Sequence, residues 1–374
     1  KWFGLRPGNE LSPQEQEQVA PTLEKTSEVM LQNFEHSNFA VEIHQCYLDL
    51  VTAGTACLMF EEAPLGEATA FHFYAVPLQE IAVEESADGK IDTTFRCSSL
   101  NWDGIRTRFP EAEIPPSLAE RCREDSDCRL KVIEAVMPRH CNAGACGYDY
   151  IAFAWDENIG SGQSFVLREG VFETSPFINF RWLKAPGEVY GRSPVMKALP
   201  DIKTANKVVE LILKNASISV TGIWQADDDG ILNPDNIKLI PGTIIPKAVG
   251  SKGLTPLAAP GDFDLSQLIL EDLRRRINHA LLADRLAQIE TPNMTATEVL
   301  ERSAEIARIL GATFGRLQSE LLTPLLKRAF GILRRRGDIL NFDLDGKIVD
   351  LQYKSPLALA QTRKDIGNVT EWVN

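Results

Sequence analysis

The second half of the chain constrains the fold most, because two apolar-striped helical segments flank an insert rich in Gly and Pro. Helices are predicted over about 194–217 and 264–282, with the insert over 220–263. Pro194 or Pro200 would begin the first helix, since proline is tolerated in a first turn, and Asp264 would cap the second. The insert contains strand-forming fragments at 222–225 and 243–245. A helix, an insert and a second helix predict a hairpin-like stalk.

A longer helix is predicted after this stalk, and it has small residues at every fourth position. They are Ser303, Ala307, Gly311, Gly315 and Ser319. This spacing places them on one side of a helix, where another backbone can approach closely. Because each glycine costs an exposed helix roughly 1 kcal/mol relative to alanine, a packing role is favoured. A neighbouring apolar stripe (Ile306, Leu310, Phe314, Leu317, Leu321) gives the helix a second usable face.

The bounds of that long helix are set by local signals. Thr295 and Glu298 have the Thr-x-x-Glu spacing of a capping box. Pro324 should kink or break the helix, and Gly337 follows its end. Arg334, Arg335 and Arg336 fall in the last turn, where cations meet the helix dipole favourably.

The first half of the chain alternates between helical and strand-like patterns. Helices are predicted over 14–34 and 39–53, with Gly54 ending the second, and Asp88-Gly89 has the composition of a hairpin turn. Strands are predicted at Thr55–Phe60, Ala70–Val76, Ile81–Glu85, Ile91–Cys97, Lys131–Met137, Tyr148–Ala154 and Ser164–Leu167. A last extended stretch reaches Trp182. This half therefore predicts an α+β fold.

Composition limits the functional classes. The chain has 374 residues, a formal net charge of −13 and seven cysteines. An acidic chain disfavours broad capture of nucleic acid, although a weakly repulsive wall would suit a duct through which DNA slides. No apolar run approaches a membrane span, no signal-peptide layout opens the chain, and the irregular cysteines favour a reducing, intracellular setting. The start at Lys1 without Met suggests a piece of a longer protein.

A Cys- and His-containing segment offers a rival interpretation. Cys122, Cys128, His140, Cys141 and Cys146 carry thiolate and imidazole donors suited to zinc. Their gaps are wider than the two to four residues that separate paired ligands in familiar sites, so free thiols are favoured. The rival is a cytosolic metal-binding enzyme that uses residues 122–146. A third alternative is a cytosolic scaffold that forms small oligomers through the small-residue helix.

No catalytic constellation is present in the sequence. A phosphate-binding loop, a Gly-x-Ser-x-Gly elbow and a His-Glu-x-x-His helix are all absent, so we expect neither an enzyme nor a bound cofactor or metal. The turn Asp227-Asp228-Asp229 is favoured as a solvated tip over a cation site. Arg274, Arg275 and Arg276 spread over about 200° of a helix, so at most two could face DNA, and ion pairs between subunits are an equal alternative.

Several motifs resemble one known family. They are Leu183-Lys184-Ala185-Pro186-Gly187-Glu188-Val189-Tyr190-Gly191-Arg192-Ser193-Pro194, then Leu199-Pro200-Asp201-Ile202-Lys203, and then Met294-Thr295-Ala296-Thr297-Glu298-Val299. Trp2-Phe3 and the stretch from Ser37-Asn38-Phe39 to Gly54-Thr55-Ala56 add to the likeness. In this order they resemble the portal (head-to-tail connector) proteins of short-tailed bacteriophages. No single motif is diagnostic, and the order of the parts carries the resemblance over nearly the whole chain.

The resemblance implies an organisation of the chain. We expect an α+β portal-protein fold with an N-terminal wing, a two-helix stem, a small β-containing clip insert, a long kinked helix and the start of a helical crown. The implied ranges are 1–193 wing, 194–219 first stem helix, 220–263 clip, 264–283 second stem helix, 284–296 channel loop, 297–336 long kinked helix, 337–354 wing strands and 355–374 crown.

The resemblance also implies a function and partners. We expect a dodecameric homo-oligomer ring in the virion, at the head-tail vertex of the capsid, assembled in the host cytoplasm and not in a membrane. Double-stranded DNA would pass through it during packaging and ejection. The terminase large subunit, tail adaptor and head-completion proteins, and the major capsid and scaffolding proteins would be its partners, and ATP hydrolysis would belong to the motor.

The resemblance further assigns the candidate site residues. The loop at the narrowest part of the channel would present Arg285, Gln288, Glu290 and Asn293, whose mixed charge suits a sliding contact. The clip would dock the motor and adaptor through Trp224, Asp227, Asp228 and Asp229. For Trp224, a buried hydrophobic role within the small insert is an alternative of at least equal weight. The small-residue stripe would pack against a neighbouring subunit, in the heterologous contact that a ring requires.

Overall fold

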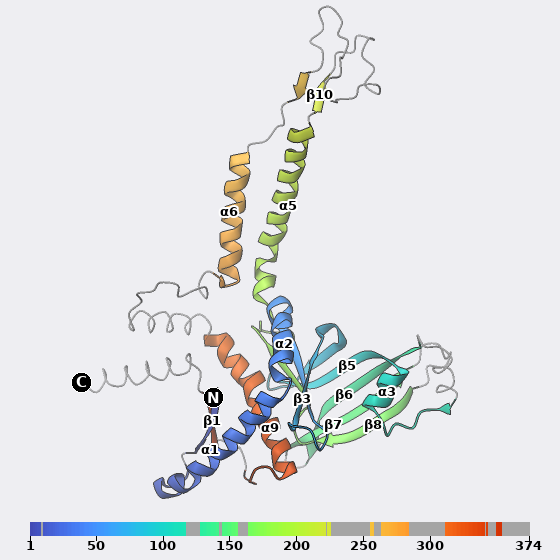
Figure 1. The fold of residues 1–374 in the computed structure, drawn as a ribbon, viewed down its shortest axis with the longest axis vertical. Helices are drawn as coiled ribbons and strands as arrows, with labels where there is room; N and C mark the ends of the chain where they lie inside the picture. Colours follow the sequence, from blue (N-terminus) through green and yellow to red (C-terminus); the bar gives the residue numbers. More distant parts are fainter. Residues whose placement is uncertain are drawn as a thin grey trace, which may run out of the picture. The chain divides into compact units, whose positions relative to one another are not determined.

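The computed structural model describes most of the N-terminal half and several parts of the C-terminal half. The described residues are 1–8, 10–116, 128–141, 144–155, 164–221, 223–225, 255–257, 263–283, 311–340, 342 and 349–353. The chain divides into two compact units, Lys1–Met196 with Gln288–Asn374, and Lys197–Ala287. Both contain helices and strands, so the predicted mixture of helix and strand is confirmed (Figure 1).

Two helices form the first layer of the larger unit, α1 (Pro13–His36) and α2 (Phe39–Ala53). Ser12 and Glu15 form a reciprocal capping box at the start of α1, which satisfies backbone N–H groups that the first turn leaves without partners. Gly54 ends α2 with φ +83°, as the sequence predicts.

A three-stranded antiparallel sheet forms the second layer, in the order β3 (Phe71–Val76), β2 (Thr55–Glu62) and β9 (Phe177–Arg181). Strand β2 is buried on both faces. Leu58 and Phe60 point to the core shared with α1 and α2, whereas Cys57 and Met59 point to a second core on the other side. The sheet is therefore the middle layer of the unit.

A five-stranded antiparallel sheet forms the third layer (Figure 1). Its strands are β4 (Ile81–Glu85), β5 (Ile91–Asn101), β6 (Arg129–Cys141), β7 (Gly144–Trp155) and β8 (Ser164–Phe172), in that order. The short helices η1 (Leu78–Glu80) and α3 (Trp102–Arg108) flank it. The predicted turn joins β4 to β5, with Gly89 at φ +78° and the Ser86 N–H donating to the Lys90 carbonyl. Each predicted strand of this half is present.

A small antiparallel pair joins the two ends of the described chain. Strand β1 (Phe3–Pro7) pairs with β12 (Val349–Tyr353), and Arg6 pairs with Asp350 at 2.7 Å. The sequence did not predict β1 because its five residues include Gly4 and Pro7, which are uncommon in strands. Phe3 is fully buried in the core, next to Trp2 and Phe34.

The long helix continues through Pro324, where the sequence predicts a kink or a break. Residues 311–317 are α-helical, Gln318–Leu322 form the π-helical turn η3, and α9 follows over Thr323–Arg336. Proline lacks the N–H of a normal turn and its ring clashes with the carbonyl four residues earlier. The wider π-turn relieves this clash, so the proline changes the helix without ending it. Gly337 then ends α9 at φ +80°.

The second unit contains α5 (Pro194–Thr221, which begins just before the unit boundary), β10 (Ile223–Gln225), β11 (Thr255–Leu257) and α6 (Phe263–Ala280). Strands β10 and β11 pair, with Trp224 opposite Pro256. Of the two predicted starts of the first helix, Pro194 is the one found, because Ser193 caps Met196, and Pro200 lies inside α5. The predicted cap of the second helix is wrong, because Asp264 lies inside α6, which begins one residue earlier. The predicted strand at 243–245 lies outside the described residues.

Candidate functional site

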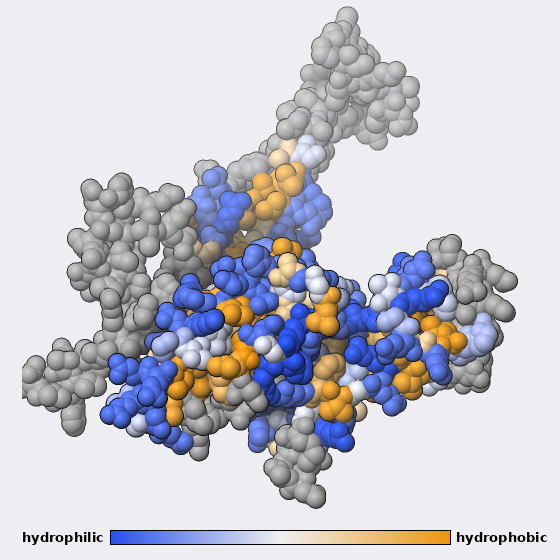
Figure 2. All heavy atoms as spheres, turned by 60° about the horizontal axis from the view of Figure 1, so that its bottom comes forward, coloured by the Kyte–Doolittle hydropathy of each residue, from blue (hydrophilic) through white to orange (hydrophobic). Residues whose placement is uncertain are grey.

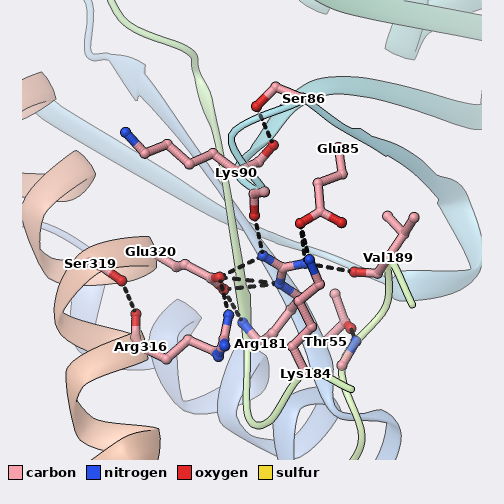
Figure 3. Close-up of polar contacts among 12 residues, drawn as sticks. Thr55, Glu85, Ser86, Lys90, Arg181, Lys184, Val189, Arg316, Ser319 and Glu320 are labelled. Atoms are coloured by element: carbon pink, nitrogen blue, oxygen red, sulfur yellow. Dashed lines mark hydrogen bonds and ion pairs between the residues drawn. The ribbon is translucent and has the colours of Figure 1, made fainter. Parts of the chain in front are cut away.

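A buried cation ties the middle sheet to the long helix in the larger unit. Arg181, at the end of β9, has no exposed side-chain surface. Its Nη2 lies 2.6 Å from Glu320 Oε1, and its backbone N–H donates to the other oxygen of Glu320 at 2.9 Å. Glu320 belongs to the π-turn η3, so this pair fixes the turn against β9 (Figure 3). Arg316 also reaches Glu320, at 2.9 Å from one turn earlier in the helix.

The same guanidinium contacts two further loops (Figure 3). Its Nη1 donates to the carbonyl of Val189 at 2.9 Å, and its Nη2 donates to the carbonyl of Gly89 in the β4–β5 turn at 3.2 Å. Glu85 adds a second carboxylate, 3.7 Å from Arg181 Nη1, and Lys184 pairs with Glu85. The hydrogen bond from Lys184 holds the pKa of Glu85 below its ordinary value. The ionic groups therefore compensate one another inside the unit.

Two glycines support this cluster through a close approach of two loops. A Cβ atom at Gly54 would lie 2.6 Å from the backbone of Gly191 and Arg192, and one at Gly191 would lie 2.1 Å from the Gly54 carbonyl oxygen. Neither position can carry a side chain without moving backbone. This contact brings the segment that resembles the portal family, residues 183–194, against the end of α2. The sequence singled out the segment but not its packing.

The predicted small-residue stripe is partly described. Ser303 and Ala307 lie outside the described residues. Gly311 and Gly315 lie on the helix, where an added Cβ at either would meet no atom of the described residues within 4 Å, and Ser319 is exposed. Leu321 on the neighbouring stripe is buried in the core at 2% exposure. The described part of the small stripe therefore packs against no other described part of the chain, whereas Leu321 of the apolar stripe packs inward.

The arginines at the end of α9 are paired within the chain. Arg334 and Arg335 contact Glu173, and Arg336 and Arg335 contact Glu62. These contacts join the C-terminal turn of α9 to β2 and to the segment after β8. They add specific partners to the helix-dipole role that the sequence predicts.

The second unit carries charged groups between its two helices. Arg276 of α6 lies 2.9 Å from Asp201 of α5, and Arg275 pairs with Asp272 on its own helix. A hollow of 670 Å³ lies here, with charges of both signs along its wall. It is lined by Lys197, Asp201, Asp272, Arg275, Arg276, Asn278, His279 and Ala280. Arg276 is thus engaged within one chain, a possibility that the sequence interpretation did not weigh.

Farther along the same helices, apolar side chains reach the surface. Leu211 and Leu213 of α5 are 54% and 64% exposed, and Leu268 of α6 is 61% exposed. Figure 2 shows apolar side chains among polar ones on this part of the second unit. Solvent-exposed leucines on these helices indicate that another chain covers them.

The other predicted site residues are described only in part. Arg285, Gln288, Glu290 and Asn293 of the channel loop, and Asp227, Asp228 and Asp229 of the clip, lie outside the described residues. Trp224 is placed by the backbone pairing of β10. No described helix is long and apolar enough to cross a membrane.

The geometry of β6 bears on the rival metal site. Cys128 precedes this strand and Cys141 ends it, so thirteen strand residues put them about 40 Å apart. They cannot ligate one ion. His140 and Cys141 do lie at the β6–β7 turn, opposite Ala145 and Gly144. Among the described residues no group of three or more His, Cys, Asp or Glu side chains could hold a metal.

Comparison with known proteins identifies the family. The profile of the bacteriophage head to tail connecting protein family matches residues 1–374. The chain belongs to this family. This head-to-tail connecting protein is 26% identical over 359 residues to the probable portal protein of Bordetella phage BPP-1. The alignment covers 93% of this chain and 64% of that protein. It is also 26% identical to the portal protein of Salmonella phage epsilon15, covering 92% of this chain and 63% of that protein.

This head-to-tail connecting protein thus spans less than two thirds of the length of these relatives. Among solved structures it is similar to a chain in the neck of an empty gene transfer agent particle, with 14% identity and a TM-score of 0.41. That alignment covers 97% of this chain and 79% of the other. A TM-score of this size is too low to support an argument about assembly.

Sequence reasoning missed the residues that hold the π-turn. In the sequence, Arg181 belongs to an extended stretch and Glu320 to the predicted long helix, and neither has a pattern that marks it. A buried arginine has no periodic signature, and its partner lies 139 residues away. The one available signal was Pro324, which indicated a local change in a helix that had to be stabilised by contacts elsewhere.

Proposed function

We propose that this chain is a subunit of a bacteriophage portal ring at one vertex of the capsid. The family match over all 374 residues carries the proposal, and the names of the curated relatives support it. The ring would be the conduit for DNA packaging and ejection and the docking site for the terminase motor and the tail adaptor. It would contain twelve copies, be assembled in the host cytoplasm, contact capsid and scaffolding proteins, and catalyse no reaction itself.

The described geometry supports an oligomer in one specific respect. Gly311, Gly315 and Ser319 offer a surface without bulk on a helix whose other side is anchored in the core. A closed ring requires each subunit to contact one neighbour with one surface and the next neighbour with another. We assign the small-residue stripe, with Ser303 and Ala307, to one of these contacts.

The finer organisation is part of the proposal. Residues 194–219 and 264–283 would form the stem, 220–263 the clip, 284–296 the channel loop and 297–336 the long helix, between wing residues 1–193 and 337–354. Residues 355–374 would begin the crown. The pairing of β10 with β11 supports a clip that contains strands, and the uninterrupted helix from 311 to 336 supports the long helix.

Deletion of the channel loop tests the conduit role. Removing Gln288 to Glu290 should leave ring assembly intact and impair genome packaging or retention, because the loop would no longer contact DNA phosphates. The measurement is the amount of packaged genome per particle in a complementation assay, with rings of the purified variant imaged in parallel. Normal packaging and normal retention with this deletion would overturn the assignment of Arg285, Gln288, Glu290 and Asn293 to a DNA contact.

A further inference from the structure

The outer face of the five-stranded sheet carries an apolar surface. Inward-facing residues of this sheet, such as Val132, Val136 and Ala152, pack in the second core. The strand registers place five exposed, large apolar residues on the opposite face. They are Phe95, Met137, Trp155, Val166 and Val171, with exposed fractions from 36% to 55%. The patch therefore extends over β5, β6, β7 and β8.

The cross-strand pairs make this surface continuous. Cys97 of β5 lies opposite Ile133 of β6, which lies opposite Phe153 of β7, which lies opposite Val166 of β8. This row crosses four strands without a charged residue. An antiparallel sheet with one face in solvent normally carries polar residues there, so an apolar outer face indicates that something covers it.

Helix α2 presents a second apolar surface. Its inner residues Ile43, Cys46 and Leu50 pack in the first core. Val41 and Leu48 are 62% and 58% exposed, lie seven residues apart on one face, and are flanked by exposed Tyr47 and Val51. This face is centred about 130° around the helix from the inner one. The helix could therefore pack on two partners at once, and the chain supplies one of them.

The apolar face of α2 and the apolar face of the five-stranded sheet lie on the two outer layers of the unit. The layers run from the helices through the three-stranded sheet to the five-stranded sheet, because β2 contributes Leu58 and Phe60 to one core and Cys57 and Met59 to the other. The exposed face of α2 lies on the free side of the first layer. The apolar row of Cys97, Ile133, Phe153 and Val166 lies on the free side of the last.

We infer that the outer face of the five-stranded sheet binds the exposed face of α2 of a second copy of this chain. The inference rests on the proposed ring, in which every subunit must present two different surfaces to its two neighbours. A helix laid on a sheet is also how α2 packs on β2 and β3 within the chain. The contact would repeat that packing between subunits.

The length of α2 supports this occupant. Fifteen residues make α2 about 22 Å long, which matches a five-strand width of about 24 Å. A helix of this length covers only part of the roughly 800 Å² per partner of a stable interface, and the small-residue stripe would supply further contact area.

Complementation between two blocked variants of the full chain tests the contact. Val166→Asp blocks the sheet face, Leu48→Asp blocks the helix face, and Leu65→Asp is the matched control, because Leu65 is 88% exposed and lies on neither surface. Sedimentation over a concentration series gives the concentration at half-assembly. We expect it to rise at least tenfold for the first two variants and to change less than twofold for the control. Val166→Thr and Leu48→Gln provide milder replacements, and thermal melting checks the fold.

The mixture of the two blocked variants gives the decisive result. At a concentration where each alone is monomeric, the intact sheet of Leu48→Asp should bind the intact α2 of Val166→Asp, so an equimolar mixture should form a two-subunit species. Wild-type-like assembly of either folded variant, or a mixture that stays monomeric, would overturn the inference while the ring of the unsubstituted chain stands. An unsubstituted chain that never assembles would overturn the proposed function as well.

Discussion

Arg181 and Glu320 are 139 residues apart in the sequence and form a bond of 2.6 Å between Nη2 and Oε1 in the interior of the larger unit. Through this pair the end of β9 fixes the π-turn that precedes Pro324. The part of the long helix before the turn, which includes Gly311 and Gly315, is thereby oriented by the sheet. The proposed subunit contact thus depends on a buried ion pair.

Glu320→Ala tests the strength of this anchor. It would leave the fully buried guanidinium of Arg181 without its main counter-charge, and removing one partner of a buried pair costs about 3 kcal/mol or more. Urea unfolding should show a corresponding loss of unfolding free energy. Glu188→Ala, which removes the exposed i,i+4 partner of Arg192, is the control and should cause little change. Equal losses in the two variants would show that the buried pair does not anchor the turn.

Gly54→Ala tests the loop packing beside the cluster. Gly54 and Gly337 share nearly the same backbone angle, with φ of +83° and +80°. A Cβ at Gly54 would meet backbone atoms at 2.6 Å, whereas one at Gly337 would meet no described atom within 4 Å. Alanine at Gly337 should cost about 1 kcal/mol through backbone strain alone. At Gly54 overpacking should add about 1–3 kcal/mol. Chemical denaturation of both variants measures the difference, and equal losses would contradict the close packing.

The buried thiol of Cys46 predicts a dependence of stability on alkaline pH. Burial raises the pKa of Cys46 from 9.0 to about 12. The unfolded chain loses the proton first, so this contribution to stability is complete below about pH 9 and is lost as the pH rises towards 12. The slope is up to about 1.4 kcal/mol per pH unit. Denaturation between pH 8 and pH 11 should show a shallower decline for Cys46→Ala, and identical slopes would contradict the assignment.

Gly311→Leu tests the small-residue contact. No described residue has an atom within 4 Å of a Cβ at this position, so the subunit should stay folded and soluble. It would fill the space that a neighbouring backbone needs, so ring assembly should be abolished. Ala312→Leu, an exposed position about 100° farther round the helix, is the matched control and should assemble. Native mass spectrometry of both variants measures assembly, and intact rings of Gly311→Leu would exclude the stripe from the contact.

Local signals in the sequence predicted most of the elements that the structure describes. Gly54 and Gly337 end helices where the sequence indicated, and the Asp88-Gly89 turn joins the two predicted strands. Such features depend on a few neighbouring residues and can therefore be predicted without knowledge of the tertiary structure. The sequence could not choose between Pro194 and Pro200 as the start of the first helix, and the structure begins it at Pro194. The cap predicted at Asp264 is wrong because aspartate is common both at the cap and in the first turn of a helix.

Contacts between distant residues could not be predicted. The pairing of β1 with β12, the bond between Arg181 and Glu320, and the approach of Gly54 to Gly191 each join segments more than a hundred residues apart. None has a periodic pattern. For the candidate site, the sequence predicted the small-residue stripe but not the anchor of the helix that carries it. The channel-loop residues were assigned from the family resemblance alone and remain a prediction.

The native mass of the purified chain, measured with particle images of the same sample, tests the central claim most directly. We predict a closed ring with a central hole and a mass that is a whole multiple of 41.5 kDa, with twelve copies expected. A monomer or dimer at every concentration, above all one that carries zinc, would contradict the portal assignment and favour the metal-binding alternative.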